Sequence, residues 1–146
     1  MKFLKIAGVL LLVLLLAVLL GPRPTFAPLE SAKIEGLKIS LDSLDNYIKA
    51  KDLGIPNLKP DNQSVIYWED SLRKTPYSVV YLHGFSASPM ESGRLPIEFA
   101  EDFGFNLYMP LLAGHGRDDR ESFIDLTPND LILSAKQAIA VGQLIG

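Results

Sequence analysis

The sequence predicts an α/β protein in which a mostly parallel sheet with flanking helices follows an N-terminal hydrophobic anchor helix. Three observations predict this class. The chain opens on a leucine-rich run. Two later stretches are nearly continuous in apolar character, as expected for strands covered on both faces of a parallel sheet. A segment with helical spacing separates these two stretches, which gives the strand, helix, strand order of a parallel unit.

Composition limits the functions that this chain can have. Its 146 residues match the length of about one domain, and 48% apolar with 21% charged residues is typical of a globular protein. After residue 21 the chain holds 12 basic against 17 acidic residues, so we expect no nucleic-acid partner. The absence of cysteine excludes disulfides and thiolate catalysis, and two histidines offer little for a metal site. We expect no metal and no organic cofactor.

Residues 1–21 are predicted to form a membrane anchor or a signal segment. Lys2 and Lys5 precede the apolar run of residues 6–20, and glycine and prolines in residues 21–24 end any helix. The run is intermediate between a signal-peptide core and a spanning helix of about 20 residues. We expect an uncleaved anchor with the rest of the chain outside the cytoplasm. Cleavage would instead give a secreted protein, and burial as a core helix is the third reading.

Residues 22–63 are predicted to contain a tether and a short amphipathic helix. Three prolines within residues 22–33 favour an extended tether that holds the domain away from the bilayer. Ser40 is a suitable N-cap, apolar residues then recur at helical spacing through Lys51, and Gly54 ends the helix. We expect this helix to pack on the domain.

The sheet is predicted from three segments. Residues 64–69 are β-branched and aromatic, with turn residues before them and charged residues after them, which is typical of a strand. Residues 77–82 and 106–112 are the two nearly continuous apolar strands. Residues 95–102 between them carry apolar side chains at helical spacing, and Gly104 ends this helix. Strand, helix and strand together form the parallel unit.

A polar loop and a final helix complete the predicted order. Two glycines turn the loop of residues 113–126, whose acidic side chains we interpret as solvated. Thr127 is then a strong N-cap, with Pro128 at the first helical position and Asp130 facing the positive end of the helix dipole. The helix runs through Leu144.

Two candidate sites follow the apolar strands. In open α/β sheets, ligands bind beyond the carboxyl ends of the strands. Residues 82–89, Leu-His-Gly-Phe-Ser-Ala-Ser-Pro, follow one strand, and residues 112–117, Leu-Ala-Gly-His-Gly-Arg, follow the next. Glycine lets the backbone turn sharply, so that successive N–H groups face a cavity and can hold an oxyanion.

The order of these motifs resembles the first half of the α/β-hydrolase family, specifically its lipase-, esterase- and serine aminopeptidase-like branch. The resemblance covers residues 64–146 and rests on the Tyr-Leu-His-Gly-Phe-Ser-Ala-Ser turn, the following helix and strand, and the Gly-His-Gly loop before a capped helix. It implies a partial α/β-hydrolase domain. It also implies a serine hydrolase that cleaves a small-molecule ester or acyl substrate, or less often an amide, through an acyl-enzyme.

The resemblance assigns roles to one turn. The backbone N–H of Phe85 would be an oxyanion donor, His83 would buttress the loop, Gly84 would permit its bend, and Ser86 would hydrogen-bond within it. An ordinary strand-to-helix turn without a catalytic role is the alternative. His115 is interpreted as a structural loop contact, because the family's catalytic histidine follows the last strand of the sheet.

The family's nucleophile, acid and base are expected downstream of residue 146. The nucleophilic serine sits in a Gly-x-Ser-x-Gly elbow on the strand after the last helix predicted here, with the acid and the histidine later still. We therefore expect this chain to be the N-terminal part of the hydrolase and inactive alone. Two alternatives stay open: Ser86 as nucleophile in a near-miss motif, and a truncated or catalytically inactive membrane-anchored binding module.

Overall fold

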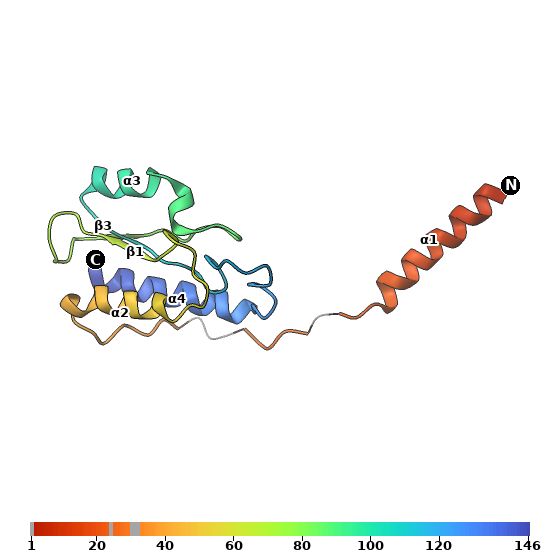
Figure 1. The fold of residues 1–146 in the computed structure, drawn as a ribbon, viewed down its shortest axis with the longest axis horizontal. Helices are drawn as coiled ribbons and strands as arrows, with labels where there is room; N and C mark the ends of the chain where they lie inside the picture. Colours follow the sequence, from red (N-terminus) through yellow and green to blue (C-terminus); the bar gives the residue numbers. More distant parts are fainter. Residues whose placement is uncertain (1, 24, 30–32) are drawn as a thin grey trace.

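The computed structural model describes residues 2–23, 25–29 and 33–146 and begins with a single apolar helix, α1 (Lys2–Leu20). No α1 side chain is buried, and Figure 1 shows the helix standing apart from the rest of the fold. The predicted N-terminal hydrophobic helix is therefore confirmed. Pro24, placed among the helix-ending residues, and residues 30–32 of the predicted tether lie outside the described residues.

The sheet differs from the prediction. Strands β1 (Val65–Tyr67), β2 (Ser78–Val80) and β3 (Asn106–Met109) pair in the order β1-β3-β2. Strand β2 runs parallel to β3, and β1 runs antiparallel to it. Over the described residues this small mixed sheet has one pair of each kind. The predicted mostly parallel sheet of an α/β-hydrolase first half is wrong.

The connection between β1 and β2 explains the difference. Residues 68–77 join the two strands without a helix. Two strands of one sheet that run in the same direction need a crossover of a dozen or more residues, usually through a helix. This shorter segment reverses the chain and sets β1 and β2 on opposite sides of β3.

The predicted parallel unit is present within this sheet. Strand β2 leads through a short 3-10 turn (Pro89–Ser92) into α3 (Leu95–Phe103), and the chain returns as β3 beside β2. Gly104 ends α3 in the left-handed conformation, with φ of 66°. The Phe105 N–H donates to the Ala100 carbonyl oxygen, as in a helix closed by glycine.

Helices cover both faces of the sheet, as predicted. Figure 1 shows α3 over one face and α2 (Leu41–Leu53) with α4 (Pro128–Ile145) over the other. Thr127 caps α4 as expected, because its hydroxyl oxygen accepts from the Asp130 N–H while the Asp130 carboxylate accepts from the Thr127 N–H. Ser40 takes the predicted N-cap position of α2, although its side chain makes no cap hydrogen bond there.

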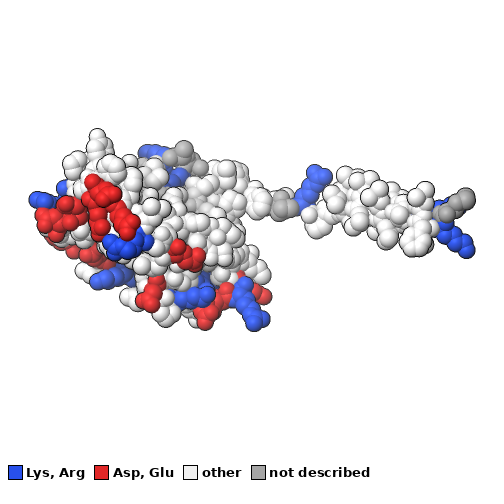
Figure 2. All heavy atoms as spheres, turned by 90° about the horizontal axis from the view of Figure 1, so that it is seen from above, with Lys and Arg blue, Asp and Glu red and all other residues white. Residues whose placement is uncertain are grey.

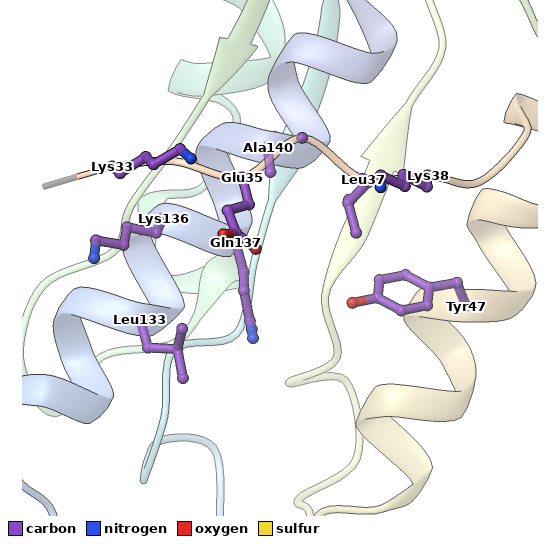
Figure 3. A pocket seen from close by; sticks show the side chains of 10 residues that line it. Lys33, Glu35, Leu37, Lys38, Tyr47, Leu133, Lys136, Gln137 and Ala140 are labelled. Atoms are coloured by element: carbon purple, nitrogen blue, oxygen red, sulfur yellow. The ribbon is translucent and has the colours of Figure 1, made fainter. Parts of the chain in front are cut away.

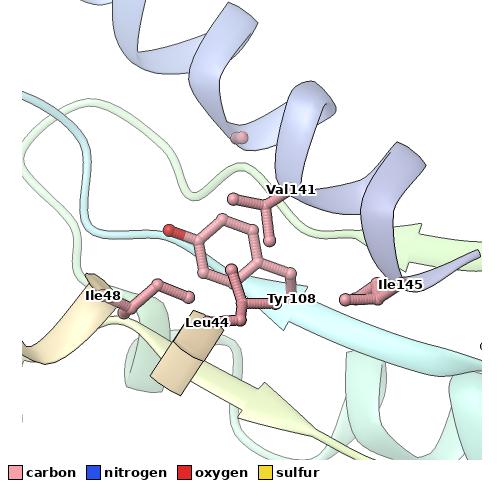
Figure 4. Packing of buried hydrophobic residues seen from close by; sticks show 6 residues of the cluster. Leu44, Ile48, Tyr108, Val141 and Ile145 are labelled. Atoms are coloured by element: carbon pink, nitrogen blue, oxygen red, sulfur yellow. The ribbon is translucent and has the colours of Figure 1, made fainter. Parts of the chain in front are cut away.

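The core is divided by the central strand. Tyr108 of β3 is 1% exposed and points into the α2 and α4 layer, whereas its neighbours in the strand point toward α3. Figure 4 shows the Tyr108 ring between the two helices. Each fully buried large apolar side chain stabilises the fold by about 1.5–3 kcal/mol. The cluster around Tyr108 contains Leu44, Ile48, Ala138, Val141 and Ile145.

A buried carboxylate fixes the end of β3 from which the candidate site extends. Asp52 of α2 is 4% exposed, and its two oxygens accept from the Ser64 N–H at 2.6 Å and the Ser64 hydroxyl at 3.0 Å. The Ser64 oxygen accepts from the Leu111 N–H at 2.9 Å. Helix α2, the start of β1 and the chain after β3 are therefore joined by hydrogen bonds that compensate the burial of charge.

Candidate functional site

The turn after β2 is attached to the next turn by His83. This side chain is 4% exposed, and its Nε2 accepts from the Leu112 N–H at 3.1 Å. Its Nδ1 lies 3.0 Å from the Gly84 carbonyl oxygen. Because Nε2 is the acceptor, the proton of the neutral ring is assigned to Nδ1, which donates to that carbonyl.

His115 makes the reciprocal attachment. Its Nε2 accepts from the Ser86 N–H at 3.0 Å, and its Nδ1 lies 2.8 Å from the Ala113 carbonyl oxygen, to which it donates by the same reasoning. The two imidazole centroids are 4.9 Å apart, with an interplanar angle of 66°. The expected structural loop contact of His115 is present, and each histidine holds the turn that carries the other.

These hydrogen bonds restrict the acid–base chemistry of the two rings. Burial lowers the pKa of His83, and the neighbouring His115 lowers it further, whereas the Gly84 carbonyl and Glu91 act in the opposite direction. In this arrangement every ring nitrogen of the two histidines has a backbone partner. Neither ring is then placed to take a proton from a nucleophile.

Phe85 presents the group that the resemblance assigned to it. Among the described residues its backbone N–H has no hydrogen-bond partner. The residues on either side are both held, since the Gly84 carbonyl oxygen accepts from the His83 ring and from the Ala87 N–H, and the Ser86 N–H donates to His115. The exposed Phe85 ring contacts His115 edge-on, with centroids 5.5 Å apart. An N–H fixed in this way is a preorganised donor for a developing negative charge.

The bend of this turn is at Ser86 and was not predicted from the sequence. Ser86 has φ of 64°, in the left-handed region that non-glycine residues rarely adopt. Gly84, to which the resemblance gave the bend, is not among the residues with positive φ, and a Cβ there would meet nothing within 4 Å. A serine between phenylalanine and alanine carries no local signal for a left-handed conformation.

The Ser86 hydroxyl is not paired with a base. Within the described residues its contact with His115 uses the backbone N–H, and the hydroxyl itself has no hydrogen bond. Ser86 lines a cavity of about 210 Å³ together with Arg117 and Arg120. Among the described residues the geometry provides no serine–histidine pair of the kind that activates a nucleophile.

The acidic loop does not complete a triad in this arrangement. Asp119 accepts from Arg117 at 2.8 Å and from the Glu121 N–H at 3.0 Å, and Asp118 and Asp125 are exposed. In the described part of the chain no carboxylate bonds to His115, and no three His, Cys, Asp or Glu side chains converge as a metal site would require.

Two features lie outside this turn: the apolar helix α1 and the distribution of charge on the surface. An 18-residue window of helix α1 has a mean hydropathy of 3.0, and the helix is long and apolar enough to cross a membrane, as a membrane anchor or a signal sequence is. Figure 2 shows α1 almost free of charged groups between its ends, whereas acids and bases are interspersed over the visible face of the domain.

No protein-family model, curated protein or solved structure matches this chain.

Proposed function

We propose that this chain supplies the oxyanion-donor part of a membrane-anchored serine hydrolase of the α/β-hydrolase family, which cleaves an ester bond through an acyl-enzyme. The observation that carries the proposal is the unpaired N–H of Phe85. It lies beyond the carboxyl end of β2, in a turn held by two buried histidines. Ligands of open α/β sheets bind at this end of the strands.

The chemistry needs this group because attack on an ester places negative charge on the carbonyl oxygen. A fixed N–H donor stabilises that charge without reorganising, and removal of one such donor costs about 10²–10³ in kcat. The nucleophile, the acid and the base lie outside residues 1–146 in this proposal. The two histidines support a base that lies elsewhere, because the ring nitrogens of His83 and His115 are all used to hold the turn.

The first test is the coding sequence that follows the Gly146 codon, read in all frames. The proposal expects a short apolar strand that leads into Gly-x-Ser-x-Gly, followed later by an aspartate and a histidine. A locus that encodes none of these leaves the oxyanion turn without a nucleophile and rejects the proposal.

The second test removes the backbone N–H of Phe85 from the enzyme expressed from the complete locus. Phenyllactic acid in place of Phe85 converts the amide to an ester and deletes the N–H while keeping the side chain. We expect kcat for a p-nitrophenyl ester to fall about 10²–10³-fold with little change in KM. The same replacement at Phe26, in the exposed tether, is the matched control and should leave kcat unchanged. Equal rates for both proteins contradict the donor role.

The proposal also places the catalytic domain outside the cytoplasm, with α1 kept as an uncleaved anchor. The charges at Lys2 and Lys5 support this orientation, because positive flanks stay on the cytoplasmic side. Mass spectrometry of the membrane fraction should recover the N-terminal peptide, and added protease should digest the domain in intact spheroplasts. Recovery of the domain from the medium without α1 would instead identify a cleaved signal and a secreted protein.

A binding module without catalytic activity is the second candidate. The occupied imidazole nitrogens favour it, since a turn whose histidines are both structural can also serve only to shape a surface. A fluorophosphonate probe separates the possibilities. Labelling of a downstream serine supports the hydrolase, labelling of Ser86 makes that residue the nucleophile, and the absence of labelling in an active-site titration favours the binding module.

A further inference from the structure

The cavity beside the candidate turn is built from three segments that are far apart in the sequence. Its walls come from Lys59 and Asn62 before β1, from Ser86 and Ser88 in the turn after β2, and from residues 116–123 after β3. Its volume is about 210 Å³. Pockets for whole small molecules measure about 300–1,000 Å³, so this cavity suits a single small group of a ligand.

Hydrogen bonds join the three segments. The Lys59 N–H donates to the Gly116 carbonyl oxygen at 2.8 Å, which ties the first segment to the third. The Ser86 N–H donates to His115 Nε2 at 3.0 Å, which ties the second segment to the third. The walls are therefore fixed before a ligand arrives, and a preorganised site loses less free energy to ordering when the ligand binds.

Several donors in these walls have no partner in the protein. Ser88 is 3% exposed, and its hydroxyl makes no hydrogen bond with any described residue. Arg117, which also lines the cavity, has a buried Nε–H that lacks a partner within the described chain. The Asn62 amide and the Ser122 hydroxyl are likewise unpaired over the described ranges. Because buried polar groups are normally hydrogen-bonded, this concentration of unused donors points to a ligand with acceptor oxygens.

The lining also carries two cations without a partner. Across the described residues, neither the Lys59 nor the Arg120 side chain makes a hydrogen bond or an ion pair. Arg117 is paired with Asp119 at 2.8 Å, and Glu91 is the other acid of the lining. The balance of the lining is one positive charge, which suits an anion with a charge of −1.

The larger cavity between the tether and the helices is less suitable for an anion. Figure 3 shows its lining, which surrounds about 480 Å³. Two of its lysines, Lys33 and Lys136, already interact with other groups. The unpaired cations and the unpaired buried hydroxyl therefore favour the smaller cavity.

We propose that the cavity beside the turn binds the carboxylate of a small organic acid, with the adjoining carbons of the acid against Ala87 and Phe123. A carboxylate carries one negative charge and two acceptor oxygens. Its hydrogen bonds with hydroxyl and cationic donors are charge-assisted and are about twice as strong as neutral ones. This site goes beyond the oxyanion role of Phe85, because it binds a carboxylate whether or not a nucleophile follows residue 146.

The position of the cavity adds a substrate class to the proposed function. The Phe85 ring lies 4.8 Å from the ring of Phe123, which lines the cavity, so the cavity and the oxyanion turn adjoin. The substrate would be the half-ester of a short dicarboxylic acid, and its hydrolysis gives the diacid and an alcohol. This step rests on the proposed function, whereas the carboxylate site does not.

The first experiment measures binding to the full chain in micelles of deuterated dodecyl maltoside. Saturation-transfer NMR follows a titration with butyrate, and butyramide is the neutral control of similar shape. We expect saturable binding of butyrate and at least about tenfold weaker binding of butyramide. This comparison uses the natural chain, so it does not depend on the folding of a variant.

Variants then assign the binding to the cavity. K59Q/R120Q removes the two unpaired cations and should weaken butyrate binding about 25-fold, at about fivefold for each charge. K49Q/R94Q removes a lysine and an arginine that do not line the cavity, and it should stay within about twofold. Ser88→Ala deletes the buried hydroxyl without breaking a side-chain hydrogen bond of the described structure, and it should weaken butyrate binding about tenfold.

Weaker binding in both cavity variants, with the control variant close to the natural chain, supports the site. Equal affinity for butyrate and butyramide overturns it, as does the absence of binding. Unchanged binding in K59Q/R120Q, or an equal loss in K49Q/R94Q, shows that butyrate binds elsewhere or by general attraction and also overturns it. Tighter binding of inorganic phosphate than of butyrate would identify a phosphate site and reject the carboxylate.

The substrate class is tested on the enzyme expressed from the complete locus. We expect kcat/KM for monoethyl succinate to exceed that for ethyl butyrate at least about tenfold. R120Q should lower the first value about fivefold and leave the second within about twofold. Equal values that R120Q does not change reject the half-ester. Hydrolysis of neither ester rejects the hydrolase, and the butyrate titration then decides the carboxylate site by itself.

Discussion

His83 and His115 hold each other's turn through the same ring atom, since each Nε2 accepts a backbone N–H from the segment that carries the other histidine. The two turns after β2 and β3 therefore move as one unit. This reciprocal pair, with ring centroids 4.9 Å apart, fixes the backbone on both sides of the Phe85 N–H.

Replacement of His115 by alanine should separate the two turns. The change removes the acceptor of the Ser86 N–H and leaves a space where a side chain 2% exposed was packed. We expect the free energy of unfolding to fall by about 2–3 kcal/mol. Urea denaturation of the full chain in detergent, followed by the fluorescence of the single tryptophan, measures it. Ser86→Ala keeps the backbone donor and should change the stability by less than about 0.5 kcal/mol.

Stability should fall as the pH falls through the ordinary pKa of histidine, 6.5. Burial lowers the pKa of His83 in the folded state, so the unfolded chain binds more protons and protonation favours unfolding. The stability from this group is present above pH 6.5 and is lost below it. His83→Gln, which keeps an acceptor but does not titrate, should flatten the dependence between pH 7 and pH 5. An unchanged slope in this variant would assign the effect to other groups.

Ser86→Gly should stabilise the fold, although most substitutions by glycine destabilise. Glycine adopts φ of 64° without the steric cost that serine bears there, and the expected gain is about 0.5–1 kcal/mol. Ser88, two residues further on, has an extended backbone with φ of −132° and is the matched control. Ser88→Gly should lower the stability by at least as much as Ser86→Gly raises it. Destabilisation by both changes would show that Ser86 is not strained.

Gly142→Ala should destabilise the fold despite the higher helix propensity of alanine. A Cβ at Gly142 would lie 2.5 Å from Cγ2 of Val80, in the strand beneath α4. We expect a loss of about 1–3 kcal/mol, and Val80→Ala in the same chain should recover part of it. Gly8→Ala, where a Cβ meets nothing within 4 Å, should leave the unfolding of the domain unchanged. Additive effects of the two substitutions at 142 and 80 would rule out this clash.

The helices were predicted from the sequence more accurately than the sheet. Thr127 and Pro128 mark the start of α4, and Gly104 marks the end of α3, because these residue types act within one turn of the backbone. The direction of β1 has no such local signal. Its alternation of side chains is the same in a parallel and an antiparallel pair, and only the length of residues 68–77 hints at the reversal.

The sequence predicted where the candidate turn lies, but it did not predict the hydrogen bonds that hold this turn. His83 and Gly84 mark a turn after an apolar strand, and this pattern is visible in the chain. The hydrogen bonds of His83 with Leu112 and of His115 with Ser86 join residues 29 positions apart. They follow from the pairing of β2 with β3, so no local pattern reports them.

The hydrogen bond from the Asn129 side chain to the Pro28 carbonyl oxygen has a mechanical consequence. Among the described residues, force applied to α1 would reach the domain at this exposed contact, beside the capped start of α4. Further along the chain, Leu37 packs against the core. The nine residue steps from Pro28 to Leu37 span at most about 30 Å when extended. Tension on the anchor would thus act on the contacts of Asn129 and Leu37 before it loads the sheet.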